Sequence, residues 1–168
     1  SGRTLNQAIK ANNDYTAENN NISKIVFDYY DSVEDDNPIY TGGGSSNLLS
    51  GLTGVSLTWN NATVEIYRAT NEDNTSTVYI LSTSDIICSA DMSNSFRNLT
   101  ALKEIVFNNF NITSATTRLS YMFSNCSSLE NVDVTEFDTS NVQYMDYMFS
   151  NCSSLQSIDV TQFITNSA

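Results

Sequence analysis

The sequence predicts an α/β fold in which short units of strand and turn stack into a solenoid behind an N-terminal α+β region. The C-terminal part repeats itself, because residues 122–141 and 148–167 are identical at 13 of 20 positions at an offset of 26. Within each unit, the apolar residues change from the two-residue period of a strand to the three- and four-residue period of a helical turn. A unit this small cannot bury its apolar side alone, so it is stable only when neighbouring units stack on it.

The first 90 residues lack this repeat and carry separate signals of secondary structure. Leu5, Ala8 and Ile9 have helical spacing, and Thr4 precedes them as a candidate N-cap. A solenoid exposes an apolar end unless something covers it, so residues 1–90 are predicted to form a capping region on the first repeat. An independent small domain is the alternative. The predicted elements are a helix over 4–12, strands over 22–30, 62–69, 75–83 and 85–89, a hairpin turn at 70–74, and loops over 31–38 and 41–46.

Residues 91–168 are predicted to hold three repeats, of which the first, at 95–113, is the most divergent and lies at an offset of 27 from the second. In the second repeat, Val132 and Val134 share one face of a predicted short strand. The apolar residues over 142–152 then follow at intervals of three and four, which is the spacing of a helical or 3₁₀ turn. The predicted core of the repeats consists of Leu99, Leu102, Phe123, Cys126, Leu129, Val132, Val134, Phe137, Phe149, Cys152 and Leu155.

Three cysteines, Cys88, Cys126 and Cys152, are spaced too widely for a zinc motif, and the chain has no histidine. Cys126 and Cys152 occupy the repeat position that Leu99 fills in the first repeat. This equivalence predicts small buried apolar side chains with free thiols. A disulfide between Cys126 and Cys152, on neighbouring repeats, is the alternative. We expect no metal site and no cofactor.

The second repeat reads MFSNCSSLENVDVTEFDTSNVQYMDYMF and resembles the BspA-like leucine-rich repeats of bacterial surface proteins. The pattern of that family is approximately MFxxCxxLxxxDxSxFDTSNVxxM. Thr135 stands where the pattern has serine, and Ser95 stands in the first repeat where the second has Met122. The resemblance covers about 91–168. It implies a leucine-rich-repeat-like solenoid, a place on the bacterial cell surface or outside the cell and, for some members, adhesion to host proteins or to other bacteria.

The charge excludes several classes of partner. Seven basic and 19 acidic residues give a formal net charge of −12, with no basic cluster, so the chain is not expected to bind nucleic acid or an anionic membrane. No apolar run is long enough to insert directly into a membrane. Because the chain has no histidine, the Ser-His-Asp and Cys-His catalytic arrangements are excluded as well. The expected partner is a protein or another cell-surface macromolecule.

The outward positions of the predicted strands are the candidate ligand-binding residues, because leucine-rich solenoids usually bind partners on the strand face. This face is polar and acidic, and a solvated face without any partner is the alternative. Asp133 and Asp159 would lie one repeat apart, where two carboxylates alone make a weak cation site. The candidate residues are Glu130, Asn131, Asp133, Thr135 and Glu136, and one repeat later Gln156, Ser157, Asp159, Thr161 and Gln162.

Three functions are compatible with these features. The first is a non-catalytic interaction module that adheres to host or neighbouring-cell macromolecules through many repeats. The second is a purely structural stalk or spacer. The third, and the most remote, is a glycoside hydrolase, which would need two carboxylates facing each other across a cleft. We therefore expect a protein that is not an enzyme.

Overall fold

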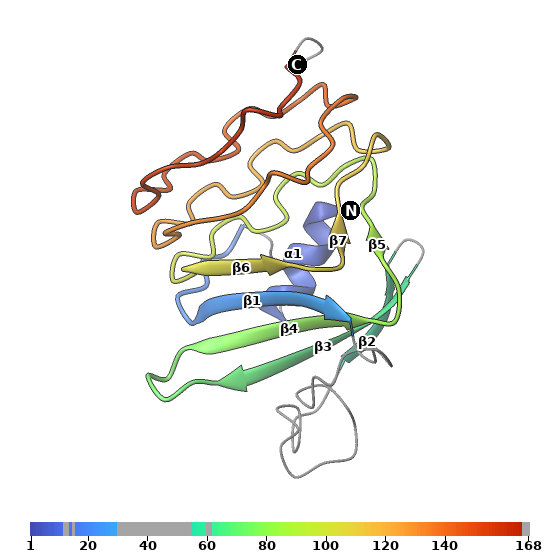
Figure 1. Ribbon diagram of the computed structural model, residues 1–168. Coiled ribbons are helices and arrows are strands. Elements are labelled where there is room, and N and C mark those ends of the chain that lie inside the picture. The colour runs from blue at the N-terminus through green and yellow to red at the C-terminus, as the bar shows by residue number, and fades with distance from the viewer. Residues whose placement is uncertain (12–13, 15, 30–54, 60–61, 166–168) are drawn as a thin grey trace.

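The computed structural model describes residues 1–11, 14, 16–29, 55–59 and 62–165 (Figure 1). Its elements are α1 (Gly2–Lys10), β1 (Ile22–Tyr29), β2 (Val55–Trp59), β3 (Ala62–Thr70), β4 (Ser76–Ser82), β5 (Ile86–Ile87), β6 (Glu104–Phe107) and β7 (Phe110–Asn111). The two loops predicted between β1 and β2 lie outside the described residues. The fold is therefore mixed α/β, with one helix and a small sheet in the described part of the chain.

Five strands form the main sheet in the order β2-β3-β4-β1-β6. The pairs β2–β3 and β3–β4 are antiparallel, whereas β4–β1 and β1–β6 are parallel. A second, two-stranded sheet joins β5 to β7 in parallel. In Figure 1 the sheet ends at β6, above which the yellow, orange and red segments of the chain follow one another.

The helix and strands predicted for the N-terminal region are confirmed, with each end shifted by at most two residues. The predicted N-cap is wrong, because Ser1 and not Thr4 precedes the helix, and strand β2 was not predicted. The predicted helix corresponds to α1, whose Leu5 and Ile9 are buried in the core. The predicted hairpin corresponds to β3 and β4, which pair from Val64 with Ser82 to Thr70 with Ser76. Its turn contains Asn74 with φ 64°, a left-handed conformation that asparagine adopts readily. Only two residues of the strand predicted over 85–89 form β5.

The C-terminal half consists of three consecutive segments, which we call rung 1 (91–117), rung 2 (118–143) and rung 3 (144–165). Isolated parallel bridges align their first residues, Asp91 with Arg118 and Arg118 with Tyr144. Backbone N–H groups of each rung donate to carbonyl oxygens of the next. Rung 1 donates from Met92, Asn94, Phe96 and Asn98 to the oxygens of Arg118, Ser120, Met122 and Ser124, over 2.8–3.1 Å. Rung 2 donates from Leu119, Tyr121, Phe123 and Asn125 to the oxygens of Tyr144, Asp146, Met148 and Ser150, over 2.7–3.0 Å.

The helical or 3₁₀ turns predicted for the repeats are wrong, because the described residues of the rungs form turns without a helix. Two residues in rung 2 have left-handed backbone angles, Tyr121 with φ 59° and Asn125 with φ 62°. A right-handed helix cannot contain such residues, so the chain turns sharply at each of them. Their N–H groups pair with rung 3 rather than within a helix.

The strands predicted for the second and third repeats are also wrong, whereas the first repeat does form a strand, β6. Val106 of β6 pairs with Val26 of β1, and rung 2 has Asp133 at the equivalent position. The Asp133 Oδ1 accepts hydrogen bonds from the Thr135 N–H at 3.0 Å and from its hydroxyl at 2.6 Å. This local turn ends the extended segment before it can pair with β6.

The core of the repeats lies where the sequence predicts it in the first two rungs. The aromatic rings stack from rung to rung: Phe96 lies 5.3 Å from Phe123, and Phe123 lies 5.2 Å from Phe149, between ring centroids. Rung 3 has no further rung above it among the described residues, so its side of the core is only half-buried. Leu99, Leu102, Phe123, Cys126, Leu129, Val132, Val134 and Phe137 are buried, and Phe149, Cys152 and Leu155 are half-buried.

The predicted division at residue 90 remains a prediction. The main sheet crosses it, because β6 in rung 1 pairs with β1. The hydrophobic core crosses it too: Phe27 of β1 contacts Phe96 at 6.0 Å and Phe110 at 4.7 Å between ring centroids. The two regions are thus packed on one another, as a capping region would be.

Helix α1 covers the end of the stack at rung 1. The carbonyl oxygens equivalent to the four acceptors in rung 2 belong to Asp91, Ser93, Ser95 and Arg97. The Gly2 N–H donates to Asp91 over 2.9 Å, and the Asn6 amide donates to Ser95 and Arg97 over 3.3 and 3.0 Å. Gly2 must be glycine here, since a Cβ would lie 2.3 Å from the Ser93 carbonyl oxygen. One polar side chain and the helix N-terminus therefore donate to three of the four carbonyl oxygens at this end of the stack.

Hydrogen exchange should distinguish the two ends of the stack. The N–H groups of Met145, Tyr147, Phe149 and Asn151 have no acceptor among the described residues, whereas their equivalents in rung 2 donate to rung 3. We expect the amides of Leu119, Tyr121, Phe123 and Asn125 to exchange at least about tenfold more slowly than these four, measured by NMR. Equal protection of both sets would show that another group covers rung 3.

Candidate functional site

The structure places nearly all the candidate ligand-binding residues at the surface. We keep the name strand face for these residues, although rungs 2 and 3 form no strands in the described part of the chain. In rung 2, Asp133 is exposed between Val132 and Val134, which are buried. Asp159 repeats the local geometry of Asp133 in rung 3, because its Oδ1 accepts from the Thr161 N–H at 3.0 Å and hydroxyl at 2.7 Å. The exposed candidates are Glu130, Asn131, Asp133, Thr135, Glu136, Gln156, Ser157, Asp159 and Thr161, and Gln162 is half-buried.

These hydrogen bonds give Asp133 and Asp159 a structural role, because each carboxylate stabilises a local turn. The hydroxyl and the N–H of the threonine two residues later lower the pKa of each carboxyl below its usual value. Both aspartates therefore stay ionised at neutral pH. One oxygen of each is already engaged, so the two carboxylates are weaker candidates for a shared cation than the sequence suggested. Among the described residues, no group of three acidic or cysteine side chains is placed to hold a metal ion.

A groove opens on this face between β6 and rung 2. It has a volume of about 240 Å³ and is lined by Ile105, Val106, Phe107, Asn108, Phe110, Asp133, Glu136 and Phe137. The aromatic rings lie close together: Phe107 is 4.8 Å from Phe110 and 5.5 Å from Phe137 between centroids. Carboxylates and aromatic rings thus face the same space. Sequence reasoning found Asp133 and Glu136 but not the rings beside them, which it assigned to the core.

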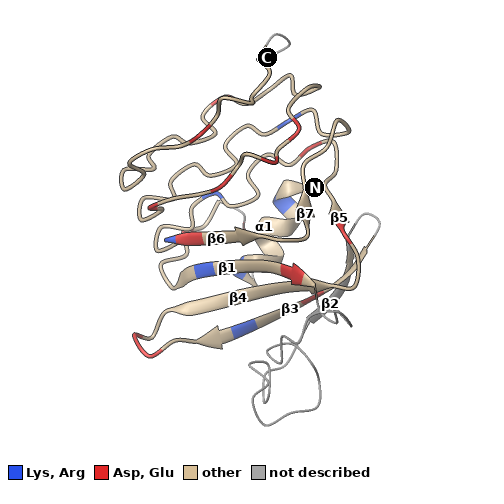
Figure 2. Ribbon diagram, in the orientation of Figure 1, with Lys and Arg blue, Asp and Glu red and all other residues tan. Residues whose placement is uncertain are grey.

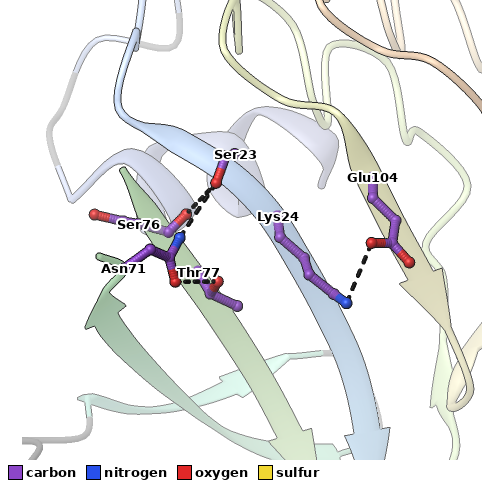
Figure 3. Close-up of polar contacts among 6 residues, drawn as sticks. All are labelled: Ser23, Lys24, Asn71, Ser76, Thr77 and Glu104. Atoms are coloured by element: carbon purple, nitrogen blue, oxygen red, sulfur yellow. Dashed lines mark hydrogen bonds and ion pairs between the residues drawn. The ribbon is translucent and has the colours of Figure 1, made fainter. Parts of the chain in front are cut away.

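A second, shallower hollow of about 430 Å³ lies where the hairpin turn at 71–75 meets β1 and β6. Figure 3 shows the polar contacts that surround it. The Asn71 amide donates to the Ser23 hydroxyl over 3.3 Å, and the Thr77 hydroxyl donates to the Asn71 carbonyl oxygen over 3.0 Å. Lys24 and Glu104 form an ion pair at 3.2 Å across β1 and β6.

The contacts around this hollow stabilise the local structure and do not form a catalytic arrangement. The Ser23 hydroxyl contacts the Thr75 hydroxyl at 2.7 Å and the Asn71 amide, and neither group is basic enough to remove its proton. Lys24 and Glu104 are 40% and 47% exposed, so solvent screens their attraction and the pair contributes little to stability. The network fixes the hairpin turn against β1.

A ladder of asparagines also joins the rungs, and the sequence analysis missed it. The Asn151 amide donates to the Asn125 carbonyl oxygen over 2.8 Å, and the Asn125 amide donates to that of Asn98 over 2.6 Å. The Asn98 amide in turn donates to the backbone oxygen of Thr16. All three asparagines have left-handed φ angles between 59° and 63°. Their shared repeat position was the available signal, since asparagine tolerates this conformation and carries both a donor and an acceptor.

The cysteines have the environments that their repeat position predicts. The Cys126 thiol donates to the Phe96 carbonyl oxygen over 3.0 Å, and the Cys152 thiol donates to that of Phe123 over 3.1 Å. All three cysteines are free in the structure. Burial raises the pKa of each thiol above its usual value.

Thiol reactivity should follow burial. Cys88 and Cys126 are buried, and Cys152 is half-buried. In the folded protein at neutral pH, we expect Cys152 to react with a thiol reagent at least about tenfold faster than the other two. All three should react in denaturant without reductant. Fewer than three free thiols under that condition would instead indicate the disulfide that the sequence left open.

Comparison with known proteins assigns the chain to a family. Residues 59–168, about two thirds of the sequence, match the family described as "Mycoplasma protein of unknown function, DUF285". The chain belongs to this family. Searches of curated proteins and of solved structures gave no match. The DUF285 region contains β3, β4 and all three rungs, whereas α1 and β1 lie outside it. No helix in the described part of the chain could span a bilayer.

Proposed function

We propose that this DUF285 protein is a non-catalytic interaction module of a bacterial cell-surface or secreted protein. Its rungs would form a BspA-like, leucine-rich-repeat-like solenoid that binds a host or neighbouring-cell macromolecule through the strand face. The supporting observation is that polar residues such as Asp133 and Asp159 recur at the surface, at the same repeat position, in rungs 2 and 3. Backbone hydrogen bonds from Glu130 to Lys103 and from Asp138 to Ile112 join rung 2 to rung 1 at the two ends of this face.

The charge distribution supports a protein partner over a nucleic acid. Residues 91–165 contain eight acidic and three basic residues, and Figure 2 shows the acidic ones distributed along the rungs. Such a surface repels phosphate and attracts basic groups. It also gives no support to the glycoside hydrolase alternative, since the lowered pKa of Asp133 is the opposite of what a general acid requires.

Surface plasmon resonance with the immobilised full chain tests the proposal, with purified extracellular-matrix and plasma proteins as analytes. We expect saturable binding of at least one analyte, weakened about tenfold or more by Glu130→Arg combined with Gln156→Arg. Both side chains are exposed, so the fold should survive. Gln143→Arg, exposed but outside the candidate face, is the matched control.

A structural spacer is the second candidate function, and the stacked asparagines and phenylalanines favour it. These ladders tie each rung to the next whether or not a partner is present. Failure of every analyte to bind saturably would favour the spacer over the interaction module. Binding that survives the double arginine variant would place the contact on a different surface.

A further inference from the structure

The groove between β6 and rung 2 exists because these two segments are joined only at its ends. The Glu130 N–H donates to the Lys103 carbonyl oxygen over 3.2 Å, and the Asp138 N–H donates to that of Ile112 over 3.1 Å. Between these bonds, no backbone hydrogen bond joins the described residues of β6 to rung 2. The turn at Asp133 carries the chain away from β6 here, and the space of about 240 Å³ remains.

The next junction, between rungs 2 and 3, is bridged at the equivalent place. The Gln162 amide donates to the Val134 carbonyl oxygen over 2.9 Å. The residue equivalent to Gln162 in rung 2 is Glu136, whose carboxylate has no N–H to donate. One change of residue type therefore removes the bridge and places a negative charge at the open junction.

The lining of the groove selects a basic side chain as its ligand. Phe107 is half-buried and supplies accessible aromatic surface, in contact with the buried rings of Phe110 and Phe137. Such a surface packs well against an aliphatic stem and attracts a cation. Asp133 and Glu136 supply negative charge, and no basic residue lines the groove to neutralise it. A small metal ion would need more oxygen ligands than two carboxylates, one of which is already hydrogen bonded.

We propose that this groove binds an arginine or lysine side chain of a partner protein, with arginine preferred. The guanidinium group is planar, stacks on aromatic rings and pairs with carboxylates through two hydrogen bonds. The inference rests on the proposed function, because it names the chemistry that the strand face would recognise. Asp133 and Glu136 pair with the charge, and the half-buried Phe107 packs against the stem.

An NMR titration of the full chain with N-acetyl-arginine methylamide tests the groove directly. We expect saturable shifts confined to residues 105–110 and 133–137, and no such shifts with the citrulline analogue, which has the same shape without the charge. Glu136→Gln should weaken binding of the arginine probe about tenfold. This variant introduces the residue that rung 3 already has at that position, so it should fold normally. Glu18→Gln, which is exposed and lies outside both the groove and the candidate binding residues, should leave binding unchanged.

The outcomes separate this inference from the proposed function. Three results would each overturn the proposed arginine binding. They are equal shifts with the arginine and citrulline probes, shifts that spread over the acidic surface without saturation, and an unchanged affinity in Glu136→Gln. If Glu136→Gln leaves binding of a macromolecular analyte intact, that analyte does not use the groove, although the interaction module stands. If the arginine probe binds saturably and no macromolecule binds, arginine binding by the groove is supported and the proposed function is contradicted.

Discussion

Replacing Phe123 with alanine should lower the free energy of unfolding by about 3–5 kcal/mol. The Phe123 side chain is fully buried, and its ring stacks on Phe96 on one side and on Phe149 on the other, at 5.3 and 5.2 Å between centroids. Truncation would leave a cavity in the middle of the stack and remove both ring contacts. Urea unfolding followed by circular dichroism measures the change.

Phe149→Ala is the matched control for this experiment. Phe149 has the same repeat position but is only half-buried and stacks on one ring, so its loss should cost less than half as much. Comparable losses for the two variants would show that rung 3 is as well packed as rung 2. That outcome would contradict the half-exposed end of the core.

Replacing Asn6 with alanine should destabilise the protein by about 1–3 kcal/mol. Asn6 is fully buried, and its amide is the donor for the carbonyl oxygens of Ser95 and Arg97. The variant would leave those oxygens buried without this donor. Losing the partner of a buried polar group destabilises a protein more than losing an exposed hydrogen bond does. Thermal unfolding measures the shift.

Thr4→Ala on the same helix is the control for Asn6. The Thr4 hydroxyl contacts only the Ser1 hydroxyl, at the surface, so its removal should change stability by less than about 0.5 kcal/mol. Equal effects of the two substitutions would mean that the hydrogen bonds from Asn6 to the carbonyl oxygens of rung 1 contribute no measurable stability.

The N-terminal elements could be predicted because local sequence decides them. In β3, for example, buried Val64 and Ile66 flank a less buried Glu65, which is the alternation typical of a strand. In α1, Leu5 and Ile9 have helical spacing and no competing turn signal. For these elements, the periodicity and the tertiary structure agree.

Prediction failed in the repeats because helical spacing also fits a chain of tight turns. Left-handed residues such as Tyr121 break the helix, and tyrosine gives no sequence signal for that conformation. The aspartate at 133 similarly prevents a strand that Val132 and Val134 alone would favour. The Tyr121 N–H donates to rung 3, whereas the turn at Asp133 is held by local hydrogen bonds from Thr135. The apolar pattern reports neither interaction.

The candidate groove was predictable only in part. The outward direction of Asp133 followed from its alternation with the buried Val132 and Val134. The separation of β6 from rung 2 did not, since it depends on which strand β6 pairs with, and that strand, β1, is far away in the sequence. Comparing Glu136 with Gln162 across the repeat was the signal that could have indicated an unbridged junction.

The occupation of the rung 1 carbonyl oxygens by α1 has a consequence for self-association. Two copies joined head to tail would pair the N–H groups of rung 3 in one copy with the carbonyl oxygens of rung 1 in the other. Because Gly2 and Asn6 already bind three of those oxygens, this contact is blocked. Head-to-tail contacts of that kind produce open filaments. Helix α1 thus occupies three of the backbone acceptors that a second copy would need at the rung 1 end of the stack.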